Sequence, residues 1–276
     1  MISPQLTDFH IHPDYSIDAK GSIEDYCLVA LRKGLKKICF TTHIDLDPRR
    51  VEVDPFMRID AEIKRIEPEF LQRYYDEIKT VQARFRDEGL EVFTGVEIDY
   101  FDGVVDIWND FNSGLKFDYI LGSVHCIDGI AFTWSKQALE CYNRFPLPIL
   151  FQKYYQSVIA LAKTNLFDCV GHLDGYRKYA ADAVGDAINH PPHELLREAL
   201  TAIKEAGIGI EINSAALRHK TGTTYPSEDI LQLAASMQVP VISLGSDAHQ
   251  PKGLAAGLDI SAGYIEKYGL KWRPRL

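Results

Sequence analysis

Short apolar stretches alternate with helical segments seven times along the 276-residue chain, and this alternation restricts the fold more than any other feature. Most of the stretches are continuous apolar runs, which is typical of parallel strands that helices cover. The expected strands are residues 6–11, 37–42, 91–98, 117–124, 166–171, 208–212 and 240–244. Seven strand–helix units predict a closed or nearly closed parallel barrel, with an open doubly wound sheet as the alternative.

The segments between the strands carry apolar residues at helical spacing. The expected helices are residues 23–33, 62–88, 149–163, 192–205, 227–237 and 254–268. No glycine-rich nucleotide-binding loop follows any expected strand, so the sequence gives the doubly wound alternative no support. We find no internal repeat and no linker, and therefore expect a single domain over residues 1–276.

Charge and cysteine usage exclude several classes of partner. The net charge of −9 disfavours non-specific binding to nucleic acid or to an anionic membrane. No apolar run approaches the roughly 20 residues that a membrane span needs, and the first residues do not resemble a signal peptide. The five scattered cysteines fit a reducing compartment. We expect a cytoplasmic protein, monomer or homodimer, that binds neither nucleic acid nor membrane.

Histidines and carboxylates gather where the expected strands end. Six of the nine histidines lie there, together with three acidic residues. Because the carboxyl ends of parallel barrel strands meet at one face, residues far apart in sequence should converge on one pocket. The set is His10, His12, Asp18, His43, Glu97, His125, His172, Asp247 and His249.

The local spacing within this set suits a metal site. His10 and His12 occupy alternate positions, so their side chains point the same way from a strand, and Asp247 and His249 repeat the spacing. Each residue alone is readily explained as a core, cap or turn residue, and only the joint pattern favours ligands. Imidazole and carboxylate without thiolate suit zinc, iron or manganese. Nine candidates are too many for one tetrahedral ion and enough for two or three.

The motifs that carry these residues resemble those of the PHP family, named for the polymerase and histidinol phosphatase groups. They are DFHIHPDYSID, TTHID, GVEIDY, GSVH, GHLDGYRK and GSDAH, and they extend from residue 8 to about residue 250. The resemblance implies an α/β fold, a distorted seven-stranded parallel (β/α)7 barrel, with three divalent metal ions at the carboxyl face of the strands.

The segments GHLDGYRKY and EINSAALRHK are similar to the histidinol-phosphatase branch of that family. This similarity implies that the chain hydrolyses L-histidinol phosphate, a small phosphorylated substrate, to L-histidinol and phosphate in histidine biosynthesis. The family motifs also imply three ligand sets. They are His10, His12, Glu97 and Asp247 for the first ion, Glu97, His125 and His172 for the second, and Asp18, His43 and His249 for the third.

For the reaction we expect a metal-bridging hydroxide to attack phosphorus in line with the leaving alkoxide, since metals lower the pKa of bound water to about 7. The positive charge of three divalent ions exceeds the negative charge of three carboxylates, so the site would attract a phosphate although the whole chain is acidic. The residues expected to act in catalysis are Glu97, Asp247 and His249. The group that protonates the leaving oxygen stays open.

Substrate contacts are expected from His43 and from two arginines on the same face, Arg177 and Arg218. Guanidinium groups suit bidentate contact with phosphate, and the structural alternative is a loop arginine paired with a carboxylate. Residues 47–60 follow the second expected strand and form either a wall of the site or a solvated loop.

Three other functions stay open at this level. The same metal cluster could serve a PHP-type phosphoesterase that cleaves nucleotide or phosphotyrosine esters. An amidohydrolase also carries H-x-H on its first strand, but it usually has eight strands and a bridging lysine or carboxylate at a mid-barrel strand end. A non-catalytic metal-binding module should lack some of the nine ligands, and none is missing.

Overall fold

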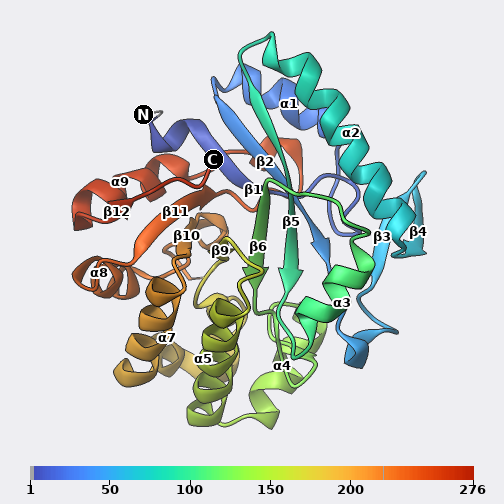
Figure 1. Ribbon diagram of the computed structural model, residues 1–276. Helices are drawn as coiled ribbons and strands as arrows, with labels where there is room; N and C mark the ends of the chain where they lie inside the picture. Colours follow the sequence, from blue (N-terminus) through green and yellow to red (C-terminus); the bar gives the residue numbers. More distant parts are fainter. Residues whose placement is uncertain (1–2, 220) are drawn as a thin grey trace.

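The computed structural model describes residues 3–219 and 221–276 and shows a curled, parallel, eight-stranded sheet (Figure 1). All seven expected strands are present and lie side by side in chain order. They are β1 (Thr7–Ile11), β2 (Lys37–Ile44), β5 (Glu91–Asp99), β6 (Tyr119–Ser123), β9 (Cys169–Val170), β10 (Gly209–Asn213) and β11 (Pro240–Gly245). The chain therefore has the α/β barrel architecture that the strand–helix alternation predicts.

An eighth strand, β12 (Lys271–Trp272), pairs in parallel with β11 and was not expected from the sequence. Near it, Arg275 forms an ion pair with Asp168 at 2.8 Å, and Leu276 packs against residues of the barrel interior. A two-residue strand carries too little hydrophobic pattern to be recognised in a sequence.

The sheet curls until β1 approaches β11. The backbone N–H of His12 donates to the carbonyl of Ala248 at 3.0 Å, and the N–H of Ala248 donates to the carbonyl of His10 at 3.4 Å. Both bonds lie at the carboxyl ends of the two strands, where Ile11 and Ala248 form an isolated parallel bridge. The barrel is thus joined at the end that bears the histidine motifs.

Helices surround the outer face of the sheet (Figure 1). They are α1 (Ile23–Arg32), α2 (Pro68–Arg86), α3 (Val104–Phe111), α4 (Ser135–Arg144), α5 (Leu147–Lys163), α6 (Ala181–Val184), α7 (His193–Glu205), α8 (Glu228–Ser236) and α9 (Leu258–Tyr268). The sequence reading missed α3, α4 and α6, which have 8, 10 and 4 residues, because such short segments carry a weak periodic signal. Among the described residues, no helix combines the length and apolar character that crossing a bilayer requires.

The expected helix over residues 62–88 begins later than predicted. Strands β3 (Phe56–Ile59) and β4 (Glu62–Arg65) form an antiparallel hairpin instead, and α2 starts at Pro68. Asp60 and Ala61 form the turn with φ of 54° and 65°, which are values that a two-residue hairpin turn of the primed type requires. Proline in the first turn of a helix fixes its start, because its missing N–H would be unpaired there anyway.

The barrel interior has its own small core. It contains only strand residues and lies apart from the larger core between sheet and helices: Phe9, Cys39, Tyr119, Leu121, Cys169 and Ile242. The phenol of Tyr119 donates a hydrogen bond to the Ser243 hydroxyl at 2.9 Å, so this polar group is paired inside the core. Packed side chains therefore fill the barrel, and chemistry is confined to the ends of the strands.

Candidate metal centre

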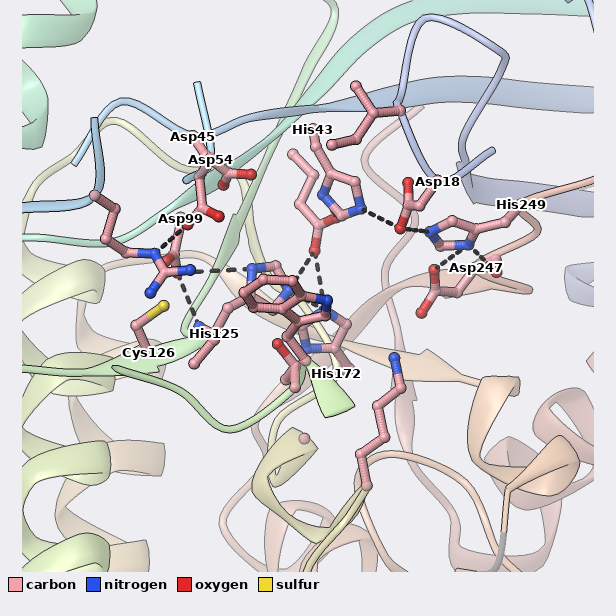
Figure 2. A pocket seen from close by; sticks show the side chains of 18 of the residues that line it. Asp18, His43, Asp45, Asp54, Asp99, His125, Cys126, His172, Asp247 and His249 are labelled. Atoms are coloured by element: carbon pink, nitrogen blue, oxygen red, sulfur yellow. Dashed lines mark hydrogen bonds and ion pairs between the residues drawn. The ribbon is translucent and has the colours of Figure 1, made fainter. Parts of the chain in front are cut away.

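The structure brings all nine strand-end residues together at one end of the barrel. Figure 2 labels Asp18, His43, His125, His172, Asp247 and His249 among them. They come from six strands or the turns that follow them. His10 and His12 belong to β1 and its exit, His43 to β2, Glu97 to β5, His125 follows β6, His172 follows β9, and Asp247 and His249 follow β11. Asp18 lies in the loop after β1. The predicted convergence is therefore present in the fold.

Glu97 lies at the centre of this cluster and is only 1% exposed. Its two carboxylate oxygens face different sets of imidazoles. Oε2 lies 3.0 Å from Nδ1 of His43, 3.3 Å from Nε2 of His10 and 3.5 Å from Nε2 of His12, whereas Oε1 lies 2.9 Å from Nε2 of His172 and 3.4 Å from Nε2 of His125. One carboxylate thus separates two groups of nitrogen donors, as a bridging ligand would.

The imidazole of His249 lies between the carboxylates of Asp18 and Asp247. Oδ1 of Asp247 lies 3.4 Å from its Nδ1, and Oδ2 of Asp18 lies 3.2 Å from its Nε2. Asp247 also reaches Nε2 of His12 at 3.3 Å, while Asp18 lies 4.0 Å from Nε2 of His43. The Asp18 side chain is 56% exposed, so this side of the cluster opens to solvent.

The close packing of opposite charges shifts the pKa values of these groups strongly. Burial would raise the pKa of Glu97, but His10, His43 and His125 hold it well below its ordinary value. Burial would lower the pKa of His43, but Glu97 and Asp18 raise it to about 10. The cluster therefore keeps its carboxylates ionised and attracts positive charge.

His12 provides the test of whether a metal fits here. Its ring is fully buried, and neither nitrogen makes a hydrogen bond to any residue that the structure describes. Burial and the neighbouring charges of His43 and His249 lower its pKa well below the ordinary value, so the ring stays neutral. A buried neutral imidazole with unpaired nitrogens is costly unless a cation accepts its lone pair.

Within residues 3–219 and 221–276, four groups of donor atoms, each within 4.8 Å of one another, are close enough to share a metal ion. They are His10–His12–Asp247, His10–Glu97–His172, His12–His43–His249 and Asp45–Asp99–His125. Nitrogen and oxygen donors in such groups suit divalent metals. The first three groups contain only residues that the sequence predicts as ligands, and the fourth adds two aspartates that it did not.

Several residues that support the cluster escaped the sequence reading. The Ser123 hydroxyl donates to Oε1 of Glu97 at 2.5 Å, and Asp99 accepts the backbone N–H of His125 at 2.8 Å. Glu211 contacts His10 from inside the barrel. The available signal for Glu211 was a charged residue between Ile210 and Ile212 in a strand that is otherwise buried.

The two predicted phosphate-binding arginines make contacts with the protein itself. Arg177 is 5% exposed, is not among the residues that line the cavity, and donates to Asp174 at 2.8 Å and to the carbonyl of Thr224 at 3.2 Å. Arg218 donates to the carbonyl oxygens of Ser246 at 2.6 Å and Asp247 at 3.3 Å, next to the cluster. Their predicted contact with phosphate stays a prediction.

Lys178, directly after Arg177, does line the cavity beside the cluster. Its ammonium makes no hydrogen bond or ion pair to the described residues and lies 5.5 Å from the ring of Tyr179. Burial and the charge of Lys178 lower the pKa of the neighbouring His219 to about 4. A cation without an anionic partner thus borders the candidate metal centre.

Residues 47–60 form part of the cavity wall. Arg50, Val53, Asp54 and Phe56 all line it, and Arg50 forms an ion pair with Asp54. Asp54 lies with Asp45 and Asp99 on the far side of His43 and His125 from Asp18 and His249 (Figure 2). The cavity therefore has an acidic wall at one end and the histidine cluster at the other.

Comparison with known proteins agrees with this arrangement. The model of the PHP domain family matches residues 8–215. A Deinococcus radiodurans protein named "probable histidinol-phosphatase" is 32% identical over 246 residues, which cover 89% of this chain and 87% of that protein. The histidinol-phosphatase of Bacillus subtilis is 27% identical over 264 residues, covering 89% of this chain and 94% of its own length.

A solved structure shares the fold. The histidinol phosphate phosphatase of Lactococcus lactis, complexed with zinc, L-histidinol and phosphate, superimposes with a TM-score of 0.76 at 22% identity and covers 96% of this chain and 94% of that one. The fold, the family match over most of the chain and the relative above 30% identity lead to one conclusion: the chain belongs to the PHP domain family.

Proposed function

We propose that this chain is a metal-dependent phosphomonoesterase that hydrolyses L-histidinol phosphate to L-histidinol and phosphate, a reaction of histidine biosynthesis. The observation that carries the proposal is the Glu97 carboxylate, whose two oxygens face separate sets of imidazoles in one cavity. The names of the relatives from Deinococcus and Bacillus support the choice of substrate.

The residues present fit three divalent ions, with zinc, iron or manganese as candidates. We assign His10, His12, Glu97 and Asp247 to one ion, Glu97, His125 and His172 to the second, and Asp18, His43 and His249 to the third. Ions at such sites lower the pKa of bound water toward 7 and neutralise charge on phosphoryl oxygens, which are the two requirements of this hydrolysis.

The chain's own residues hold the substrate's phosphoryl group. Lys178 is the cavity cation without an anionic partner, so we assign it a charge-assisted contact with a phosphoryl oxygen. Arg218 fixes the backbone at Asp247 through two carbonyl oxygens and thereby orients that carboxylate toward His10 and His12. His43 borders the cavity between the cluster and the acidic wall, and we assign it to both the metal and the substrate.

The L-histidinol part of the substrate is complementary to the acidic wall of the cavity. L-Histidinol phosphate carries an ammonium group and an imidazole, both of which favour neighbouring carboxylates. Asp45 and Asp54 line that end of the cavity, together with the apolar side chains of Val53, Phe56 and Trp134. A cationic, partly aromatic leaving group is therefore complementary to the pocket in charge and in surface.

Rates on three esters test the proposal. Zinc- or manganese-loaded protein should have the highest kcat/KM on L-histidinol phosphate, with release of inorganic phosphate. A nucleoside monophosphate and a phosphotyrosyl peptide are the comparison substrates, because neither places a compact cation beside the phosphate. Equal kcat/KM values on all three would remove the assigned substrate, and release of an amine without phosphate would remove the reaction type.

A further inference from the structure

We propose that Glu211, on β10, is a positioning residue that serves two of the metal positions at once. It is 0% exposed and does not border the cavity, so it cannot contact the substrate. The inference rests on the metal centre of the proposed function and concerns how that centre is built.

Glu211 contacts two candidate metal ligands, His10 and His172. Its Oε1 lies 2.8 Å from Nδ1 of His10, and its Oε2 accepts the backbone N–H of His172 at 2.8 Å. Asn213, two residues further along the strand, adds a hydrogen bond to Oε2 at 3.2 Å. Both carboxylate oxygens are therefore engaged, one by an imidazole and the other by the backbone of a second histidine.

The contact with His10 sets the tautomer of that ring. With Glu211 as the acceptor, Nδ1 of His10 carries the hydrogen, and the amide Nδ2 of Asn213 lies 3.3 Å from the same nitrogen. Nε2, which lies 3.3 Å from Oε2 of Glu97 and 3.7 Å from Oδ1 of Asp247, is then the nitrogen that would bind an ion. Carboxylate partners of this kind fix the ring orientation of metal-binding histidines in many proteins.

The space for this carboxylate depends on Gly245 of β11. A Cβ atom there would lie 1.9 Å from Oε1 of Glu211 and 2.4 Å from Cβ of His10. A methyl group at residue 245 is therefore incompatible with the pair as it stands. Glycine at residue 245 thus leaves the space that the contact between Glu211 and His10 occupies.

The two contacts of Glu211 lead to different ions. In the assignment proposed above, His10 binds one ion with His12 and Asp247, and His172 binds another with His125 on the other oxygen of Glu97, although His10, Glu97 and His172 also form one donor group. Loss of the Glu211 carboxylate should therefore weaken two metal positions together and leave the Asp18–His43–His249 position intact.

Glu211→Gln tests this with little change in volume. The imidazole of His10 and the backbone of His172 each donate an N–H to Glu211. An amide offers only one acceptor oxygen, so either the ring of His10 loses the acceptor that fixes its tautomer or the backbone N–H of His172 loses its acceptor. Zinc-loaded wild-type and E211Q protein are dialysed against buffers of fixed free zinc, and bound zinc per chain is measured by mass spectrometry. We expect zinc affinity at two positions to fall about 10- to 100-fold.

Asp118→Asn is the matched control. Asp118 also accepts the backbone N–H of a strand residue, Thr94 at 2.9 Å, but touches no imidazole. D118N should keep the wild-type zinc content. Wild-type zinc content in folded E211Q, or loss of one ion only, overturns the shared role of Glu211.

A measurement on the unaltered protein covers the case in which E211Q does not fold. Nitrogen-15 shifts of His10 in the zinc-loaded wild type should show a protonated Nδ1 and a metal-bound Nε2. An unprotonated Nδ1 overturns the inference. Wild-type protein that binds fewer than two zinc ions overturns the proposed metal centre itself, so the two failures are distinguishable.

Discussion

Arg177 and Lys178 are consecutive in sequence but have opposite environments. The guanidinium of Arg177 is buried against Asp174, whereas the ammonium of Lys178 has no anionic partner among the described residues and borders the cavity. They are separated by the end of the short helical turn Gly175–Arg177, which turns one side chain inward and the next toward the site. The pair offers a direct comparison of a cation paired within the fold and a cation that we assign to the substrate.

Lys178→Met should weaken substrate binding and leave the fold unchanged. A hydrogen bond to a charged group is worth about 1.5–3 kcal/mol, or roughly 10- to 100-fold in affinity. We expect KM for the phosphate ester and Ki for inorganic phosphate to rise by that factor, measured by steady-state kinetics with zinc-loaded protein. Unchanged phosphate inhibition in K178M would contradict the assigned contact.

Arg177→Met should instead lower the free energy of unfolding. The variant leaves Asp174, which is 0% exposed, without its cation, and removal of one partner from a buried pair costs about 3–5 kcal/mol. Urea denaturation of metal-free protein measures the loss. If R177M is as stable as the wild type but binds phosphate about 10-fold more weakly, the sequence-based assignment of Arg177 to phosphate is correct after all.

Glu97→Gln should abolish hydrolysis with little change in secondary structure. The amide cannot present two anionic oxygens to the two sets of imidazoles, and Ser123 already donates to one of them. We expect kcat to fall at least about 100-fold and bound zinc to drop, with an unchanged circular dichroism spectrum. Ser123→Ala is the milder companion, because it removes one donor to Glu97 and no ligand. Turnover of E97Q at the wild-type rate would exclude a bridging role.

Asp45→Asn should reduce selectivity rather than general activity. Among the described residues no hydrogen bond or ion pair holds the Asp45 side chain, and burial raises its pKa to about 7, so a neighbouring cationic substrate group would favour its ionised form. KM for L-histidinol phosphate should rise about 10-fold, and KM for p-nitrophenyl phosphate, which carries no ammonium, should stay constant. Equal increases for both esters would mean that Asp45 serves the metals instead.

Metal loading should release protons at neutral pH. Although burial opposes it, neighbouring carboxylates raise the pKa of His10 well above the ordinary value and that of His43 to about 10. Both rings are therefore protonated in the metal-free chain at pH 7, and an incoming ion must displace the protons. Apparent zinc affinity should rise with pH, and calorimetric titrations in buffers of different ionisation enthalpy should count the protons. Zinc binding without proton release would contradict these pKa shifts.

The raised pKa of His43 also determines how the folding stability of the metal-free protein changes with pH. Because the pKa of His43 is raised from 6.5 to about 10, its interactions stabilise the fold fully below pH 6.5. That contribution disappears as the pH rises through about 10.

The sheet and the cluster were predictable because both follow from a one-dimensional pattern. Apolar runs mark the seven strands, and the carboxyl ends of parallel strands share one face, so His10 and Asp247 had to meet. The hairpin of β3 and β4 was not predictable, since Glu62 to Arg65 carry charges that suit an exposed helix equally well. Strand β12 is too short to show a pattern.

The pattern of apolar runs and residue spacing does not predict the orientation of single side chains. The sequence analysis assigned Arg177 to phosphate and did not consider Lys178, because sequence spacing does not show which side chain a short helical turn directs toward the cavity. Glu211 is hidden for a related reason. In a sequence it reads as a charge in a strand, and only the fold shows that it faces His10 on a strand about 200 residues away.

The bridge between Ile11 and Ala248 has a consequence for the biogenesis of the protein. His10 and His12 are synthesised long before Asp247, their partner in one donor group. A nascent chain that has not reached Asp247 therefore carries an incomplete donor group. An ion at this group would bind only after β11 has been synthesised, and it would then link the end of β1 to the end of β11.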